Sequence, residues 1–300
     1  MDRLDAMNVV VAIGEAGSLS AASRLLRMPL PTVSRKLSEL EAHLAARLFN
    51  RSTRRLTLTD AGLAYLSACK RILEDVAEAE RTATGEFSAP RGDLVVAAPV
   101  VFGRLHVLPL IVAFQRAYPE VRVRLMQSDR LSNLLEDHVD VAVRIGELAD
   151  DQLVATRCGS TRRITCASPA YLKQHGRPRS PDALAAHTLI AFDGLTSAEV
   201  WTFRGKSSVV SVPIRPTLVV NTAEAAIDAA IAGAGITRVL SYQIEGAVNA
   251  GLLTPILERH EPAPSPISLV YPQQRRLPLK VRAFLDYTAP QLRRRLGKAP

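Results

Sequence analysis

A run of hydrogen-bond donors opens one helix of this sequence. In PLPTVSRKLSELE, residues 29–41, Pro31 fits the first turn of a helix because its missing N–H would be unpaired there. A fixed first turn fixes the directions of the side chains that follow it. Donors at a helix N-terminus suit the major groove of DNA, where an arginine can bond guanine through two hydrogen bonds and an apolar side chain can meet a thymine methyl. The residues predicted to face DNA on this helix are Leu30, Pro31, Thr32, Ser34, Arg35, Lys36 and Ser38.

A second basic segment follows in RLFNRSTRRLTLTDAG, residues 47–62. RSTRR is typical of a turn, and RLTLT alternates as a short strand does. We interpret the segment as a hairpin wing beside the donor-bearing helix. Arg51, Arg54 and Arg55 at its tip are predicted to contact phosphates or the minor groove, which adds affinity more than sequence choice.

Two earlier helices must hold the donor-bearing helix in place. Apolar residues recur at helical spacing over residues 3–16 and predict the first of them. Gly17 ends that helix and Ser18 is suited to cap the next one. Together with the helix that Pro31 opens, this order indicates a helix-turn-helix. An ordinary three-helix bundle with a basic face is the alternative.

A long helix is expected to begin at TDAG, residues 59–62, and to reach about residue 87. Leu66, Cys69, Leu73 and Val76 follow one another in steps of three and four, as in the seam of a two-helix coiled coil, although Glu80 interrupts the seam. The pattern favours pairing with a second copy of the chain. Packing of the helix on its own domain is the alternative.

Charge and cysteine content narrow the class of protein. The 300 residues carry a net charge of +9, and residues 24–55 alone hold eight arginines and lysines against two glutamates. An anionic partner is therefore expected at this segment. The three scattered cysteines fit neither a disulfide framework nor zinc spacing, which favours a reducing compartment. No signal peptide and no stretch of membrane-span length is expected, so we expect a cytoplasmic protein without a membrane partner.

The order of these motifs resembles the winged helix-turn-helix of the LysR-type transcriptional regulators. The resemblance covers residues 1–62 almost without a gap and extends in length and order along the whole chain. It implies a homodimer through the long helix, often a tetramer, bound to a partly palindromic site on double-stranded promoter DNA, with RNA polymerase as a further partner. Pro31, Ser34 and Arg35 match the family's base-reading positions. Pro29-Leu30 stands where the family commonly has Ser-Gln, so a polar base contact is expected to be absent here.

Beyond residue 89, strands and helices alternate in the order β-α-β-α-β, which predicts a mostly parallel sheet flanked by helices. The residues alone predict an α/β fold of one or two lobes. The resemblance implies a two-lobed effector domain like a type II periplasmic binding protein, with chain crossings near residues 160–165 and 263–268. The expected organisation is a DNA-binding domain over 1–60, a linker and dimerisation helix over 61–88, and a regulatory domain over 89–300, with lobe I at about 92–162 and 268–300 and lobe II at about 163–267.

Ligands of such sheets bind at the carboxyl ends of strands, beside helix N-termini. Free N–H groups and Arg144 at these places favour a small carboxylate effector. Asn221 and Arg144 each have a purely structural alternative. Asn221 could only cap its helix, and Arg144 could only pair with a nearby carboxylate. The predicted effector contacts are Val100, Val101, Phe102, Ser128, Arg144, Ile145, Asn221 and Thr222.

Catalytic motifs are not evident in the sequence. GAGITR, residues 233–238, lacks the third glycine of the dinucleotide fingerprint, and neither a P-loop nor a nucleophile elbow occurs. The six histidines are dispersed without zinc spacing. We therefore expect no enzyme, no cofactor and no metal. The rivals of a regulator are an exported solute-binding protein of the same α/β type and a metabolic enzyme fused to a DNA-binding module.

Overall fold

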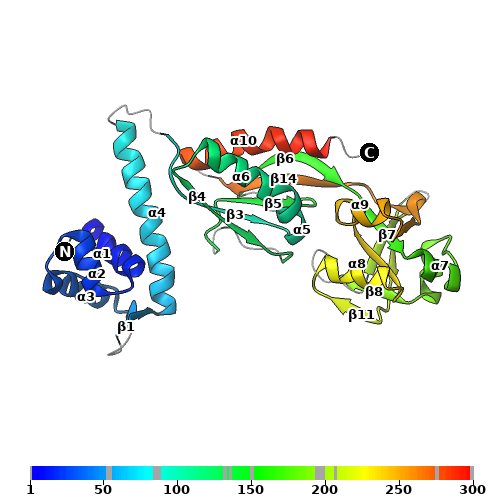
Figure 1. Cartoon of the computed structure of the whole chain (residues 1–300), viewed down its shortest axis with the longest axis horizontal. Coiled ribbons are helices and arrows are strands. Elements are labelled where there is room, and N and C mark those ends of the chain that lie inside the picture. The colour runs from blue at the N-terminus through cyan, green and yellow to red at the C-terminus, as the bar shows by residue number, and fades with distance from the viewer. Residues whose placement is uncertain are drawn as a thin grey trace. The chain divides into compact units, whose positions relative to one another are not determined.

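The chain folds into two compact units, Met1–Ala89 and Pro90–Pro300 (Figure 1). The computed structural model describes residues 2–51, 56–83, 89–130, 134, 137–148, 152–192, 200–205, 208–273 and 277–297. The tip of the predicted wing, with Arg54, Arg55 and the side chain of Arg51, lies outside the described residues. The segment LSNLLED, residues 131–137, for which the sequence predicts a helix, also lies mostly outside the described residues.

Three short helices form the core of the first unit: α1 (Arg3–Ala16), α2 (Leu19–Leu26) and α3 (Leu30–Leu44). Side chains cap the first two, since Asp2 accepts from the Leu4 N–H at 3.0 Å and Ser18 accepts from the Ala21 N–H at 3.1 Å. The helix predicted over residues 3–16 is confirmed as α1. The three helices enclose one apolar cluster, which includes Val10, Ile13, Ala22, Val33, Leu37, Leu40 and Leu48.

A hairpin and a long helix complete this unit. Strand β1 (Phe49–Arg51) pairs antiparallel with β2 (Leu56–Leu58), and α4 runs over Asp60–Ala83. The Thr59 hydroxyl donates to the Arg47 carbonyl at 2.7 Å and accepts from the Gly62 N–H at 2.9 Å, so it ties the start of α4 to the hairpin. Gly62 is required by close approach, because a Cβ atom there would lie 1.9 Å from the Leu48 carbonyl oxygen.

One face of α4 packs on α1 within the same chain. Leu66 joins the apolar cluster of the first unit and lies against Gly14, and Cys69 is fully buried. Lys70 of α4 forms an ion pair with Glu15 at 2.8 Å. Leu66 and Cys69 therefore pack on the helix's own domain, as the alternative has it, and pairing of two chains through this helix stays a prediction.

The first sheet of the second unit has the strand order β4-β3-β5-β14-β6. Strand β3 is parallel to β4 and β5, whereas β14 is antiparallel to β5 and β6. The predicted mostly parallel sheet is therefore mixed, because β6 leaves this lobe and β14 returns beside it in the opposite direction. The strands are β3 (Gly92–Ala98), β4 (Val121–Gln127), β5 (Val141–Ile145), β6 (Leu153–Thr161) and β14 (Ser265–Pro272). Because Ser265 already pairs with Thr161, residues 265–267 belong to this sheet and not to lobe II as expected.

Helices cover this sheet. A continuous helical segment is formed by α5 (Val100–Phe102), the π-helical turn η1 (Gly103–Val107) and α6 (Leu108–Ala117), and α10 covers Leu279–Leu296. Among the described residues, this segment, Val100–Ala117, has the length and mean hydropathy (1.3) of a possible membrane span, contrary to the expectation that no stretch approaches that length. Its buried face joins α10 in the core of the sheet, with Phe102, Val107, Leu110, Phe114 and Phe284 in one apolar cluster.

The second sheet has the order β11-β8-β12-β7-β13 and forms the other lobe. Strand β12 is parallel to β8 and antiparallel to β7, so this sheet is mixed as well. The strands are β7 (Arg163–Ala167), β8 (Leu189–Phe192), β11 (Leu218–Val220), β12 (Ile236–Leu240) and β13 (Thr254–Ile256); a separate hairpin pairs β9 (Val200–Arg204) with β10 (Val209–Pro213). The helices are α7 (Pro169–His175), α8 (Ala223–Ile231) and α9 (Ser241–Asn249), with the 3-10 turns η2 (Pro181–Ala186) and η3 (Glu258–His260).

Candidate functional site

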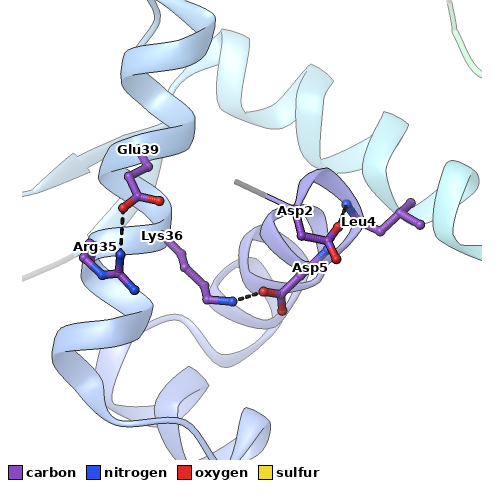
Figure 2. A network of polar contacts seen from close by, with 6 residues as sticks. All are labelled: Asp2, Leu4, Asp5, Arg35, Lys36 and Glu39. Carbon is purple, nitrogen blue, oxygen red and sulfur yellow. Dashed lines mark hydrogen bonds and ion pairs between the residues drawn. The ribbon is translucent and has the colours of Figure 1, made fainter.

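The N-terminal turns of α3 present exposed side chains above a buried inner face. Val33 and Leu37 are fully buried in the unit's core, whereas Leu30 is 42% exposed. The Arg35 side chain is 67% exposed and pairs with Glu39, one turn along the helix, at 3.0 Å (Figure 2). Exposed pairs of this kind contribute at most about 1 kcal/mol, so a base edge or phosphate can displace Glu39 at little cost.

The other predicted DNA contacts on α3 differ in exposure. Pro31 and Ser38 are exposed, and Thr32 and Ser34 are half-buried. Lys36 is half-buried and its ammonium group forms an ion pair with Asp5 of α1 (Figure 2). Lys36 therefore fixes α3 against α1 and is not displayed as the predicted DNA contact.

A residue that the sequence did not single out holds the hairpin to α3. The Glu41 carboxylate, in the last turn of α3, accepts from the Leu48 N–H at 2.8 Å and from the Phe49 N–H at 3.2 Å. These two residues are buried and lead into β1, so the bonds set where the wing leaves the core. The position of Glu41 in the sequence could have predicted such a contact, because a glutamate on the inward side of a helix needs hydrogen-bond donors nearby.

A second group of predicted residues lies where the two lobes of the second unit meet. Val101 packs in the core of the second lobe and its neighbour Phe102 in the core of the first. The Tyr242 ring, on α9 of the second lobe, meets the Phe102 ring edge-on at 5.3 Å between centroids. Val100 donates its N–H to Asp129 at 3.1 Å. Predicted residues 100–102 therefore lie at the junction of the lobes.

The structure gives less direct support for the remaining predicted effector residues. Thr222, and not Asn221, caps α8, where its hydroxyl accepts from the Ala225 N–H at 3.3 Å. Ser128 is exposed and its hydroxyl accepts from the Arg130 N–H at 3.2 Å. Arg144 and Ile145 are half-buried near the end of β5. Burial lowers the pKa of Arg144 while the charge of Asp137 acts in the opposite direction, which favours the alternative that Arg144 pairs with a carboxylate.

Three polar residues at the junction were missed by the sequence reasoning: Asp129, Glu224 and Tyr242. Burial raises the pKa of Asp129; the Val100 N–H counteracts this shift and the charge of Glu224 adds to it. Burial also raises the pKa of the Tyr242 hydroxyl, and the charges of Asp129 and Glu224 raise it further. These three side chains therefore lie within each other's electrostatic field. Asp129 directly follows the predicted contact Ser128, but no sequence signal joins it to the other two.

Comparison with known proteins decides the family. The profile described as "Bacterial regulatory helix-turn-helix protein, lysR family" matches residues 4–63, and "LysR substrate binding domain" matches residues 88–293. The chain belongs to the LysR family. This LysR-type regulator is 34% identical over 289 residues to an HTH-type transcriptional repressor of Pseudomonas aeruginosa, a match that covers 96% of this chain and 91% of the relative. It is also 34% identical over 290 residues to the transcriptional regulator CrgA of Neisseria meningitidis, covering 95% and 96% of the two chains.

Solved structures agree with this assignment. The CrgA structure has a TM-score of 0.61 at 31% identity and covers 96% of this chain and 98% of its own. The full-length structure of AphB, a virulence activator of Vibrio cholerae, has a TM-score of 0.60 at 28% identity, covering 95% and 98%. These neighbours confirm the predicted fold class, a helix-turn-helix followed by an α/β regulatory domain. The relatives are named transcription regulators and not enzymes, so the prediction of a non-enzymatic, DNA-binding regulator with an effector-binding domain is confirmed.

Proposed function

We propose that this LysR-type regulator reads promoter DNA with the N-terminal turns of α3. The observation that carries the proposal is the exposed Arg35 at the start of a helix whose inner face is fixed in the core. Arg35 would bond guanine in the major groove, and exposed Leu30 would meet a thymine methyl. The arginines of the predicted wing would contact the flanking backbone. Thr32, Ser34 and Ser38 would add contacts to base edges or phosphates.

A homodimer would present two such helices to successive major grooves. Apolar side chains on α4 remain accessible for such a contact, since Leu63 is 62% and Ile72 36% exposed. Leu73 and Val76, which are half-buried and follow Leu66 and Cys69 along the same stripe, are proposed to continue the contact between the two chains. We further propose that two such dimers form a tetramer, which acts on RNA polymerase at the promoter in the cytoplasm.

The junction of the two lobes is the proposed site of a small-molecule effector. Residues 100–102, Asp129 and Tyr242 come from both lobes, so a ligand bound among them would change how the lobes approach each other. An effector alters DNA binding only if it binds the two states of the regulator with different affinity. The predicted carboxylate effector retains the support of the N–H groups at the start of α8, but Arg144 lies beside Asp137 and supports it less.

Selection of bound sequences from random DNA by the full-length protein tests this function. The expected result is a two-fold symmetric motif whose half-sites lie about 10 base pairs apart, or a multiple of that spacing, because one dimer meets the same face of the duplex at each helical turn. Recovery of no enriched motif at moderate salt would contradict sequence-specific recognition. Enrichment of a motif without symmetry would contradict the dimer and leave recognition by α3 intact.

A further inference from the structure

We propose that the effector of this regulator carries a cationic nitrogen group, such as a primary ammonium, which binds between Asp129, Glu224 and Tyr242. The inference rests on the proposed effector-sensing function and names the chemical class of the ligand. It departs from the carboxylate expected from the sequence, although a carboxylate elsewhere on the same molecule is compatible with it.

Buried oxygen atoms without partners carry the proposal. Asp129 is only 7% exposed; its Oδ1 accepts from the Val100 N–H, while its Oδ2 is shielded from solvent and has no hydrogen-bond partner within the described residues. Glu224 Oε2 and the Tyr242 hydroxyl oxygen are likewise shielded from solvent and have no hydrogen-bond partner within the described residues. The three atoms come from the segment that follows β4, the first turn of α8 and the first turn of α9. Three oxygen atoms from separate segments thus have unused hydrogen-bonding capacity, on side chains that lie within one another's electrostatic field.

Their charge indicates what they would bind. A buried carboxylate is costly unless it is paired or fully hydrogen-bonded. Along the described ranges no Lys, Arg or His nitrogen forms a salt bridge with Asp129 or Glu224. The two carboxylates each raise the pKa of the Tyr242 hydroxyl, and the charge of Arg163 lowers it. Two carboxylates therefore face one guanidinium at this junction, so a further cation is favoured over a second anion.

An ammonium group matches these acceptors in number as well as in charge. It has three N–H donors and no acceptor, and the three unpartnered atoms are all oxygens that can accept. Its alkyl or aryl substituent would meet the apolar rings of Phe102 and Tyr242, which contact each other across the junction. Asp129 belongs to the first lobe and Glu224 and Tyr242 to the second, so such a cation would draw the lobes together. The ligand would therefore favour the state of the regulator in which the two lobes lie closer together.

Matched probes separate a cationic from an anionic ligand. Binding of benzylamine and butylamine, and of benzoate and butyrate, is measured by calorimetry on the full-length protein at neutral pH. Asp129→Asn preserves the Oδ1 acceptor for Val100 and removes the charge, and Glu224→Gln removes the second charge without loss of length. Asp228→Asn is the control, because Asp228 is an exposed carboxylate one turn along the same helix as Glu224.

We expect the amines to bind at millimolar concentration and each junction variant to weaken that binding by roughly ten-fold or more, as for the loss of a hydrogen bond between charged groups. Asp228→Asn is expected to leave the affinity unchanged. The inference is overturned if only the carboxylates bind, if no amine binds at millimolar concentration, or if Asp228→Asn weakens binding as much as the junction variants do.

Two further readouts separate failure of this inference from a merely structural role and from failure of the proposed function. Without ligand, Asp129→Asn should raise the melting temperature, since it removes an uncompensated buried charge. A fall would show that this carboxylate is structural and would overturn the inference. Binding of the selected DNA motif is measured in the same samples. If DNA binds normally and amines have no effect, the ligand class is wrong while the regulator function stands.

Discussion

Removal of the Glu41 carboxylate tests how the wing is held to the recognition helix. Glu41→Ala leaves the N–H groups of Leu48 and Phe49, which now donate to Glu41 at 2.8 and 3.2 Å, without an acceptor in a buried position. An unsatisfied buried donor costs roughly 1–3 kcal/mol, so the two together should lower the free energy of unfolding of this unit by about 2–6 kcal/mol. For a domain of this size, about 1 kcal/mol moves the melting temperature by roughly 4–8 °C, so a fall of about 10 °C or more is expected.

The two units can be followed separately in the full-length chain. The sequence has a single tryptophan, Trp201, which lies in the second unit, so its fluorescence reports that unit alone. Far-ultraviolet circular dichroism reports the helices of both units. Glu41→Ala should split off an early helical transition and leave the Trp201 transition in place. Glu41→Gln, which keeps an acceptor oxygen, should lose less than half as much stability. Equal losses in the two variants, or no loss in Glu41→Ala, would refute the assigned role of these bonds.

Two further perturbations follow from close contact and from buried charge. Gly62→Ala should destabilise the first unit by about 1–3 kcal/mol, as expected for overpacking, because its Cβ would lie 1.9 Å from the Leu48 carbonyl oxygen. The control Gly246→Ala in α9, which has open space around it, should be neutral or stabilising by up to about 1 kcal/mol. Both are measured by urea unfolding, and equal stability of the two variants would contradict the importance of the close approach at Gly62. The pKa of Asp129 is raised above its usual 3.8 in the folded state, so its contribution to stability is fully present below about pH 3.8 and is lost as the pH rises through the folded pKa. Asp129→Asn should therefore have a higher melting temperature than the wild type at pH 7, and this difference should shrink toward pH 4. A constant difference across that range would contradict the raised pKa. Burial is the main cause of the shift, the Val100 N–H opposes it, the charge of Glu224 adds to it, and Asp129 in turn acts on Tyr242.

Local patterns were sufficient to predict much of the fold. Helical spacing predicts α1 over residues 3–16, and the alternation in VRVRLMQ, residues 121–127, is typical of a strand and coincides with β4. The order of motifs around Pro31 and Arg35 was sufficient to predict the family. These features depend on neighbours in the sequence, where periodicity, capping and turn chemistry act directly.

The parts that failed depend on contacts between distant residues. Lys36 resembled a surface donor, and only the packing of α3 on α1 brings it to Asp5. Leu66 and Cys69 fit a coiled-coil pattern, but the same spacing also suits packing on α1, and the pattern cannot tell these apart. The antiparallel return of β14 follows from the path of the chain through the second lobe. Asp129, Glu224 and Tyr242 meet only because two lobes close on each other, and no spacing in the sequence records that.

Competition for the selected operator measures recognition by α3 most directly. Affinities of wild type, Arg35→Ala and Arg35→Lys are compared for that operator and for random DNA at one fixed salt concentration. Loss of one bidentate contact costs about 1–3 kcal/mol per helix, so Arg35→Ala should lose most of its preference for the operator. Arg35→Lys should lose less of this preference and should keep its affinity for random DNA, because its charge is retained. An Arg35→Ala protein that still prefers the operator as strongly as the wild type does would contradict the account.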